Sequence, residues 1–476
     1  MRSVSFRVAV LGLSAVLLVS GGMALSGALA LDAQPPAELA GPRLGTPVLS
    51  VRRAPELLSR TVAHIRLGDE LDAAMTSPAV GSGAASSCLT VEEGDVTIYG
   101  RQADLTLVPA STLKVLTGLS VLQRMGAAFQ FVTEVRADKP VIDGILDGPL
   151  WLVGAGDPLL STQAYAVSFR NQPQVFTSID ELADRIVAAG VREIRGGVVG
   201  DESRFDSIRY YPTWKPGYIT DNEIGPVSAL VVNDNFSQFR PQKTIAATAP
   251  ATHGAGVLTE LLRGRGVLVA DPSEGAAPEA ASPVASITSP PLPEIVGELL
   301  RESDNMTAEV LTKEMGRRYG SGGTWAEGTR IIKETITMAG LPSQGYAAVD
   351  GSGLDVSDRL SCSLLMDTLD LVGRNSPVTA GFAIAGQTGT LAQRFKGNPA
   401  QGRLRAKTGS LNFVSGLVGY VDAADDRSLE FALLANDLPS RNDAGRLLQE
   451  RVGAILATYP KAPPAANLEP VAPVDP

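Results

Sequence analysis

The stretch VPASTLKVLTGLSVLQRMG, residues 108–126, contains a Ser-x-x-Lys tetrad that runs from Ser111 to Lys114. Residues three apart share one face of a helix, so the lysine amine can reach the serine hydroxyl, take its proton and leave a nucleophile. Pro109 suits the approach to a helix, and Gly126 suits its end. Between them the apolar residues recur at helical spacing, at Leu113, Leu116, Leu119 and Leu122. The stretch predicts a helix whose start carries a nucleophile and its base, although a tetrad alone also fits a surface helix with a solvated lysine.

Two further strings favour the catalytic interpretation. Ser303-Asp304-Asn305 lies in LLRESDNMTAEVL, and Lys407-Thr408-Gly409-Ser410 lies in RLRAKTGSLNFVSGLVGYV. With the tetrad they complete, in the required order, the three motifs shared by penicillin-binding proteins and active-site serine β-lactamases. The three together are far more specific than any one of them.

Composition limits the classes of function. The chain has 476 residues with a hydrophobic share of 44%, which is enough for about two or three domains with sizeable cores. Its formal charge of −10 argues against a nucleic-acid partner, which requires a basic face. The sequence has only two histidines, which is little material for a Ser-His-Asp triad or a zinc site. His64 is expected to precede the folded core and His253 to lie in a loop, both as bystanders, and we expect no metal and no cofactor.

The N-terminus has the pattern of an export signal. Arg2 and Arg7 precede an apolar run from Val8 to about Leu25, and Ala28-Leu29-Ala30 supplies a small-x-small cleavage pattern. Residues 1–30 are therefore predicted to be a cleaved signal peptide or an uncleaved membrane anchor, which would be the chain's only link to a membrane. Either alternative places the folded part outside the cytoplasm, secreted to the cell envelope or anchored to the membrane.

The two cysteines, Cys88 and Cys362, are a candidate disulfide. An oxidising compartment favours their pairing, whereas two buried free thiols remain the alternative.

Strand-like and helical patterns alternate along the chain and predict an α+β fold with a long interruption. Roughly 190 residues separate the first motif from the second, which is more than one helical subdomain needs, so the catalytic domain is predicted to be discontinuous. Asp271–Ser286 and the end of the chain have the composition of a linker and of a disordered tail. The predicted divisions are a leader at 1–30, a linker at 31–56, a first catalytic part at 57–149, inserted and mainly β-containing domains at 150–286, a second catalytic part at 287–458, and a disordered tail at 459–476.

The sequence resembles the class C low-molecular-mass penicillin-binding proteins, the D-alanyl-D-alanine carboxypeptidase/endopeptidase family. The resemblance covers most of residues 80–455. Besides the three motifs it rests on GAGDPLL, GVVGDESRFD, VDGSGLD and AGQTGTLAQRF, which begin at Gly154, Gly197, Val349 and Ala385. It implies a penicillin-binding protein / serine β-lactamase-like catalytic domain, with a five-stranded antiparallel sheet flanked by helices and the active site at the sheet edge.

The resemblance also implies roles for the motif residues. Ser111 would attack the carbonyl of the penultimate D-alanine, and Lys114 would be the base, neutral near pH 7 because of burial and the nearby charge of Lys407. Ser303 would relay the proton to the departing amine, and Asn305 would hold the substrate backbone. The last motif would bind the terminal carboxylate through Lys407 and Thr408, leave room for the substrate at Gly409, and form the oxyanion hole from the N–H groups of Ser111 and Ser410.

The side-chain pocket departs from the family pattern. Where the family tends to place an arginine after the DGSGL turn, this chain has Val356, and Arg359 is the nearest substitute. Asp221, Glu223 and Asn412 are further candidates for this pocket. The preference for the third residue of the peptide is therefore open.

These features predict a serine-type D-Ala-D-Ala carboxypeptidase/DD-endopeptidase that acts on peptidoglycan stem peptides and is inhibited by β-lactams. A β-lactamase or esterase of the same fold is an alternative, although no acidic residue stands out as a water-activating base. A peptidoglycan-binding scaffold with an idle serine is a second alternative, which the complete motif set disfavours.

Overall fold

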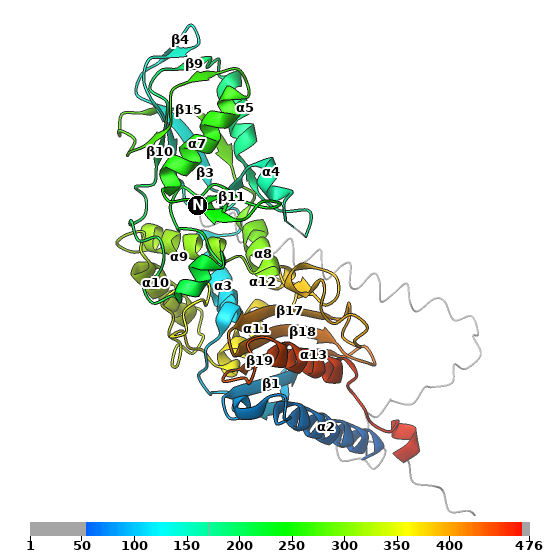
Figure 1. Ribbon diagram of the computed structural model, residues 1–476. Coiled ribbons are helices and arrows are strands. Elements are labelled where there is room, and N and C mark those ends of the chain that lie inside the picture. Colours follow the sequence, from blue (N-terminus) through cyan, green and yellow to red (C-terminus); the bar gives the residue numbers. More distant parts are fainter. Residues whose placement is uncertain (1–53, 170, 469–476) are drawn as a thin grey trace, which may run out of the picture. The chain divides into compact units, whose positions relative to one another are not determined.

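The computed structural model describes residues 54–169 and 171–468 (Figure 1). The predicted leader, most of the predicted linker and the last eight residues of the predicted tail lie outside the described residues. Within the described part, no helix is both long enough and apolar enough to cross a membrane.

The catalytic part is built on a sheet in which every neighbouring pair of strands is antiparallel. Its strand order is β16-β17-β18-β19-β1-β2. The five longer strands confirm the predicted sheet, and a two-residue strand adds a sixth. In that order the strands are Ala383–Ile384, Leu404–Leu411, Val414–Asp422, Ser428–Ala435, Ser87–Glu93 and Val96–Arg101.

Both faces of this sheet are buried because apolar residues alternate along its central strands. On β18 and β19, Val418 and Leu434 belong to one hydrophobic cluster, whereas Leu417 and Leu433 belong to the other. The first cluster includes residues of helices α3 (Lys114–Met125), α8 (Leu292–Glu302), α9 (Asn305–Tyr319), α10 (Trp325–Met338) and α11 (Cys362–Val372), with the short α12 (Pro377–Ala380) beside them. The second includes residues of helices α2 (Ala54–Met75) and α13 (Asp443–Ala457).

The insertion has its own five-stranded sheet, in the order β14-β10-β6-β3-β15. The strand β3 pairs antiparallel with β6 and β15, whereas β10 pairs parallel with β6 and β14. Helices α5 (Ile179–Ala188) and α7 (Pro250–Arg263) contribute to the same core as this sheet, so the insertion is not as predominantly β as predicted. In sheet order the strands are Ser273–Glu274, Val198–Asp201, Leu150–Val153, Val132–Ala137 and Ser282–Thr288.

Shorter elements complete the insertion. A small sheet has the order β13-β9-β5-β4, and two strand pairs, β7 with β8 and β11 with β12, lie apart from it. These strands are Leu268–Val269, Glu193–Ile194, Ile145–Leu146, Val141–Ile142, Leu160–Ser161, Thr177–Ser178, Phe236–Gln238 and Ile245–Ala246; the short helices are α4 (Gln163–Ala166) and α6 (Pro216–Thr220).

The structure corrects several predicted boundaries. The insertion's sheet begins at β3, ahead of residue 150, and the predicted linker at 271–286 contains β14 and most of β15. The tail does not begin at 459, because Tyr459 is buried in the second cluster and Lys461 forms an ion pair with Glu70 of α2. The linker prediction is likewise too long by a few residues, since α2 begins at Ala54.

The predicted surroundings of the histidines are also wrong. His64 lies in α2, whose apolar face packs into the second cluster. The His64 ring stacks on the Tyr459 ring, with 6.3 Å between the two ring centroids. His253 lies in helix α7 rather than in a loop, with Nε2 3.2 Å from Val232 O.

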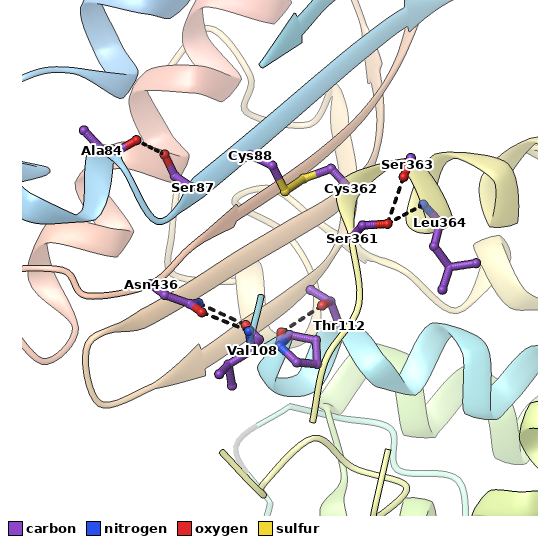
Figure 2. The surroundings of a disulfide bond; sticks show 11 residues. Ala84, Ser87, Cys88, Val108, Thr112, Ser361, Cys362, Ser363, Leu364 and Asn436 are labelled. Atoms are coloured by element: carbon purple, nitrogen blue, oxygen red, sulfur yellow. Dashed lines mark hydrogen bonds between the residues drawn. A yellow bond between two sulfur atoms is a disulfide. The ribbon is translucent and has the colours of Figure 1, made fainter. Parts of the chain in front are cut away.

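A disulfide and a side-chain amide fix the segment that leads into the first motif (Figure 2). Cys88 of β1 and Cys362 at the start of α11 form a disulfide, and both cysteines are fully buried. Asn436, just after β19, accepts a hydrogen bond from Val108 N at 2.9 Å and donates one to Val108 O at 3.1 Å. Leu107 pairs with Leu360, two residues before Cys362, so the disulfide and the Asn436 amide together hold the chain just ahead of the first motif beside the sheet.

Replacing both Cys88 and Cys362 by alanine is expected to lower the free energy of unfolding by about 2–5 kcal/mol, because the disulfide closes a very long loop of the unfolded chain. Denaturant titration of the double variant against the parent measures this change. A thiol reagent added to the denatured, unreduced parent is expected to label neither cysteine. Labelling of both thiols, or an unchanged unfolding curve, would contradict the pairing.

Candidate active site

The first motif begins in a 3₁₀ turn and ends in a helix. The turn spans Ala110–Leu113, and Lys114 is the first residue of α3, which ends at Gly126 as predicted. Lys114 Nζ lies 3.0 Å from Ser111 Oγ, 2.7 Å from Asn305 Oδ1 and 2.8 Å from Ser352 O. A neutral amine has two N–H groups and one lone pair. The two carbonyl oxygens therefore suit its N–H groups, and the lone pair is left to accept the hydroxyl proton of Ser111.

The second motif lies at the junction between helices α8 and α9. Ser303 closes α8 in the left-handed region, at φ 63°, and Asp304 caps α9 by accepting a hydrogen bond from Met306 N. Asn305 is the first residue of α9, and its Nδ2 donates to Glu223 O at 2.8 Å. The junction places Ser303 Oγ 2.7 Å from Lys407 Nζ.

The third motif lies on the edge-proximal strand β17, where the amine of Lys407 is completely buried. Lys407 Nζ also donates to Thr408 O at 2.8 Å, and Thr408 Oγ1 donates to Thr390 Oγ1 at 2.9 Å. Ser410 Oγ donates to Asn442 Oδ1 at 3.1 Å. The three motifs thus converge from a turn, a helix junction and a strand.

A cleft of about 490 Å³ opens over these groups. Hydroxyl, amide and backbone groups of all three motifs line it, and Lys114 and Lys407 lie buried beneath it. The predicted residues that line the cleft are Ser111, Glu223, Ser303, Asn305, Thr408, Gly409, Ser410 and Asn412.

Burial is the main cause of the altered proton affinity of Lys114. It lowers the pKa of Lys114 to about 8, and the negative charges of Glu309 and Asp350 oppose this effect. Burial, one of the two predicted causes, is confirmed, whereas Lys407, the other, is not among the main causes of this shift. The repulsion between the two amines instead adds to burial in lowering the pKa of Lys407 well below its ordinary value.

A buried carboxylate that the sequence analysis missed supports Lys114. Glu309 accepts hydrogen bonds from Trp325 Nε1 at 2.6 Å and from the backbone N–H groups of Gly351 and Ser352 at 3.1 and 2.8 Å. Glu309 thereby fixes the loop whose Ser352 carbonyl contacts Lys114. The sequence did offer a signal, since Glu309 follows Asn305 by one helical turn on the same face of α9.

Asp350 organises the same loop from within. Its carboxylate accepts hydrogen bonds from Gly353 N at 2.7 Å, Asp355 N at 2.8 Å and Trp214 Nε1 at 2.8 Å. The DGSG string thus forms a turn, and through Ser352 that turn is also part of the site.

This arrangement of motifs has a counterpart among known proteins. The sequence matches the family described as D-Ala-D-Ala carboxypeptidase 3 (S13) over residues 67–244 and 238–459. The chain belongs to this family. Members of the S13 family are serine peptidases, so the protein is a serine-type peptidase of the D-Ala-D-Ala carboxypeptidase class, and the predicted family and fold class are confirmed.

Curated relatives of the S13 type cover most of the chain. A D-alanyl-D-alanine carboxypeptidase of Actinomadura sp. (strain R39) is 27% identical, over 89% of this chain and 90% of that protein. Carboxypeptidase Rv3627c of Mycobacterium tuberculosis is 30% identical, over 75% of this chain and 76% of that protein.

The fold is shared with a solved structure, penicillin binding protein 4 (DacB) from Haemophilus influenzae. The TM-score is 0.66 at 21% identity, over 78% of this chain and 96% of that chain. The same protein complexed with a β-lactam matches with a TM-score of 0.58 at 19% identity, over 77% of this chain and 94% of that chain.

Two residues predicted to bind substrate in this S13 chain do not reach the cleft. Arg359 folds back on its own turn and donates to the carbonyls of Val356 and Asp358, each at 2.7 Å. Asp221 ends helix α6 and lines a different cavity. Tyr218 and Glu223 line the cleft, so of the two acidic candidates only Glu223 is present there.

Gly409 also has a packing role that the sequence analysis did not predict. A Cβ at this position would lie 2.7 Å from Pro109 O and 3.1 Å from Thr112 Cγ2. The missing side chain therefore lets the turn that carries Ser111 pack directly on β17, rather than only clearing a path for substrate.

Gly409→Ala is expected to slow acylation of Ser111 by about 100-fold, because the added methyl group displaces the turn by a fraction of an ångström or more. Stopped-flow labelling with a fluorescent penicillin measures the rate. The matched control is Gly100→Ala on β2, where an added Cβ approaches only Thr97 Cγ2, at 3.9 Å. Equal rates in the two variants would show that close packing at Gly409 does not position Ser111.

The reaction of Ser111 is expected to accelerate as pH rises, because the lone pair of Lys114 becomes available only when the amine loses its proton. With the pKa of Lys114 at about 8, the rate should rise about fiftyfold between about pH 6 and 8. A neutral fluorophosphonate probe, which has no carboxylate for Lys407 to bind, isolates this effect. A rate that is flat or falls over this range would argue against Lys114 as the base.

Proposed function

We propose that the protein is a D-Ala-D-Ala carboxypeptidase and DD-endopeptidase that cleaves peptidoglycan stem peptides through an acyl-enzyme on Ser111. The single observation that carries this proposal is the contact between Lys114 Nζ and Ser111 Oγ, at 3.0 Å, in which both N–H groups of a neutral lysine are already used by Asn305 and Ser352. Such a lysine can only accept the serine proton.

In the acylation step Ser111 Oγ attacks the carbonyl carbon of the penultimate D-alanine while Lys114 takes the hydroxyl proton. The backbone N–H groups of Ser111 and Ser410 stabilise the oxyanion. When the C–N bond breaks, the proton passes from Lys114 to the departing amine through Ser303, and the terminal D-alanine, or the amino group of a cross-link, leaves. Water then attacks the ester, which restores the Ser111 hydroxyl and releases the shortened peptide as a carboxylate.

Lys407 and Thr408 bind the terminal carboxylate in this proposal. A carboxylate beside the buried Lys407 amine would stabilise its charged form and raise its lowered pKa. This requirement favours a substrate with a free α-carboxylate at the leaving residue. It also accounts for binding of β-lactams, which carry a carboxylate next to the reactive amide, and the β-lactam complex of the Haemophilus protein is consistent with this binding.

We also propose that the protein works outside the cytoplasm, where peptidoglycan lies. The support is the export pattern of residues 1–30, which lie outside the described residues, together with the disulfide between Cys88 and Cys362. The N-terminal sequence of the mature protein distinguishes a cleaved leader from a membrane anchor.

Ser111→Ala is expected to abolish both labelling by fluorescent penicillin and release of D-alanine from a pentapeptide that ends in D-Ala-D-Ala. Because Ser111 is only partly buried and its side chain is small, the variant should unfold at the same temperature as the parent. An alanine variant that labels as well as the parent would reject the nucleophile. A parent that labels but releases no D-alanine would instead favour the β-lactamase or scaffold alternatives, and comparing turnover on a pentapeptide and a cross-linked dimer separates the two proposed activities.

A further inference from the structure

A second cavity, of about 120 Å³, lies between helix α8 and the α4 segment of the insertion. Its volume is several times the ~30 Å³ that one water occupies in the liquid. Its walls are mainly apolar and aromatic, and they include Leu159, Tyr165, Ala166, Phe169, Val175 and Phe176. The polar lining consists of four carboxyl groups, those of Asp234, Glu298, Glu302 and Asp304, together with Ser161 and Gln174.

One of these carboxyl groups has an unused acceptor. The side chain of Glu298 on α8 is buried, and the residue is only 3% exposed. Its Oε2 accepts a hydrogen bond from Arg301, whereas its Oε1 has no hydrogen-bond partner among the described residues. A buried carboxylate oxygen without a partner is costly, which points to a donor that the site is built to accept.

The neighbouring carboxyl groups already have partners. Asp304 accepts hydrogen bonds from Met306 N and from the hydroxyl of Thr307, and both are contacts of a helix cap. Glu302 Oε2 accepts a hydrogen bond from Asn171 Nδ2 at 2.7 Å, and its Oε1 lies 3.5 Å from Arg301 Nε. Asp234 Oδ2 accepts one from the Tyr165 hydroxyl at 2.7 Å. A ligand in this cavity is therefore expected to donate its first hydrogen bond to Glu298 Oε1, the acceptor that has no partner among the described residues.

The shape and charge of the cavity favour an organic cation. Among the described residues, no group of three or more His, Cys, Asp or Glu side chains is arranged to hold a metal ion. Aromatic and aliphatic walls suit a cationic head on an apolar stem, through cation–π contact and burial of the stem. We propose that this cavity binds an alkylammonium group, as presented by a lysine-like side chain or by a short free amine.

Protonation of the carboxyl groups makes ligand binding at this site depend on pH. Burial raises the pKa of Glu298 to about 7 and that of Asp234 to about 8, and it also raises the pKa of Asp304. Glu298 and Asp234 are therefore partly protonated near neutral pH when the cavity is empty, whereas an ammonium group binds their ionised form. Binding therefore releases protons and strengthens as pH rises through these values.

The other charged or titratable groups around the cavity do not reverse this pH dependence, in which binding strengthens as pH rises. Arg301 is paired with Glu298 and Glu302, and the charge of Lys114 acts on Asp304 from the active site. The Tyr165 hydroxyl stays neutral, because burial and Asp234 raise its pKa well above its ordinary value.

Calorimetric titration of the intact protein with n-butylammonium chloride tests the proposal, with n-butanol as the uncharged probe. We expect saturable binding of one butylammonium per chain, about tenfold tighter at about pH 8 than at about pH 6, and no saturable binding of butanol. A capped lysine residue serves as a second probe. If it binds more tightly than butylamine, the natural ligand is a peptide side chain, and if it binds more weakly, the ligand is a free amine.

Glu298→Gln should weaken butylammonium binding at least tenfold, whereas Glu294→Gln, an equal charge change at an exposed position of the same helix, should not. Ala166→Leu fills the cavity without altering any charge and should also abolish binding, which keeps the test valid if Glu298→Gln does not fold. Ser111→Ala should bind the amine as the parent does, because this site is separate from acylation. Linear heats of mixing, equal affinity for butanol, or binding that survives both Glu298→Gln and Ala166→Leu would overturn the proposal.

Discussion

The site depends on one buried amine and the oxygens that surround it. Lys114 is fully buried, and its Nζ contacts the hydroxyl of Ser111, the amide oxygen of Asn305 and the carbonyl of Ser352. Burial of an ammonium group is unfavourable, so the protein stabilises the neutral amine. Each contact comes from a different segment of the chain, and the nucleophile is therefore competent only when the turn, the helix junction and the DGSG loop are all in place.

The surrounding carboxylates oppose the effect of burial on the pKa of Lys114. Glu309 and Asp350 are also buried, and their charges favour the protonated form of Lys114. Their hydrogen bonds go chiefly to backbone N–H groups and to two tryptophan side chains, so the same groups that fix the loop also limit how far the pKa of Lys114 falls. The result is a base whose pKa lies near the pH at which such an enzyme works, which is the most effective value for proton transfer.

Sequence patterns predicted the parts whose signals are local. The helix between Pro109 and Gly126 and the mixture of strands and helices along the chain follow from periodicity, and the structure contains both. What failed depends on contacts between distant segments. The packing role of Gly409 and the support from Glu309 are set by the approach of other loops. Arg359 is a local exception, because it donates to carbonyl groups of its own turn. Composition also misled, because Pro- and Ala-rich residues 271–286 form strands once a partner strand is available.

The central claim is that Lys114 accepts the Ser111 proton in its neutral form, which a lowered pKa makes available near neutral pH. The most direct test is an NMR pH titration of protein labelled with ¹³C at the lysine ε-carbons, with Lys114→Arg used to assign the signal. The account predicts a titration near pH 8 for Lys114, well below its ordinary value of 10.5. A Lys114 signal that titrates near 10.5 would contradict the account, because fewer than about one amine in a thousand would then be neutral at pH 7, against roughly one in ten at a pKa of about 8.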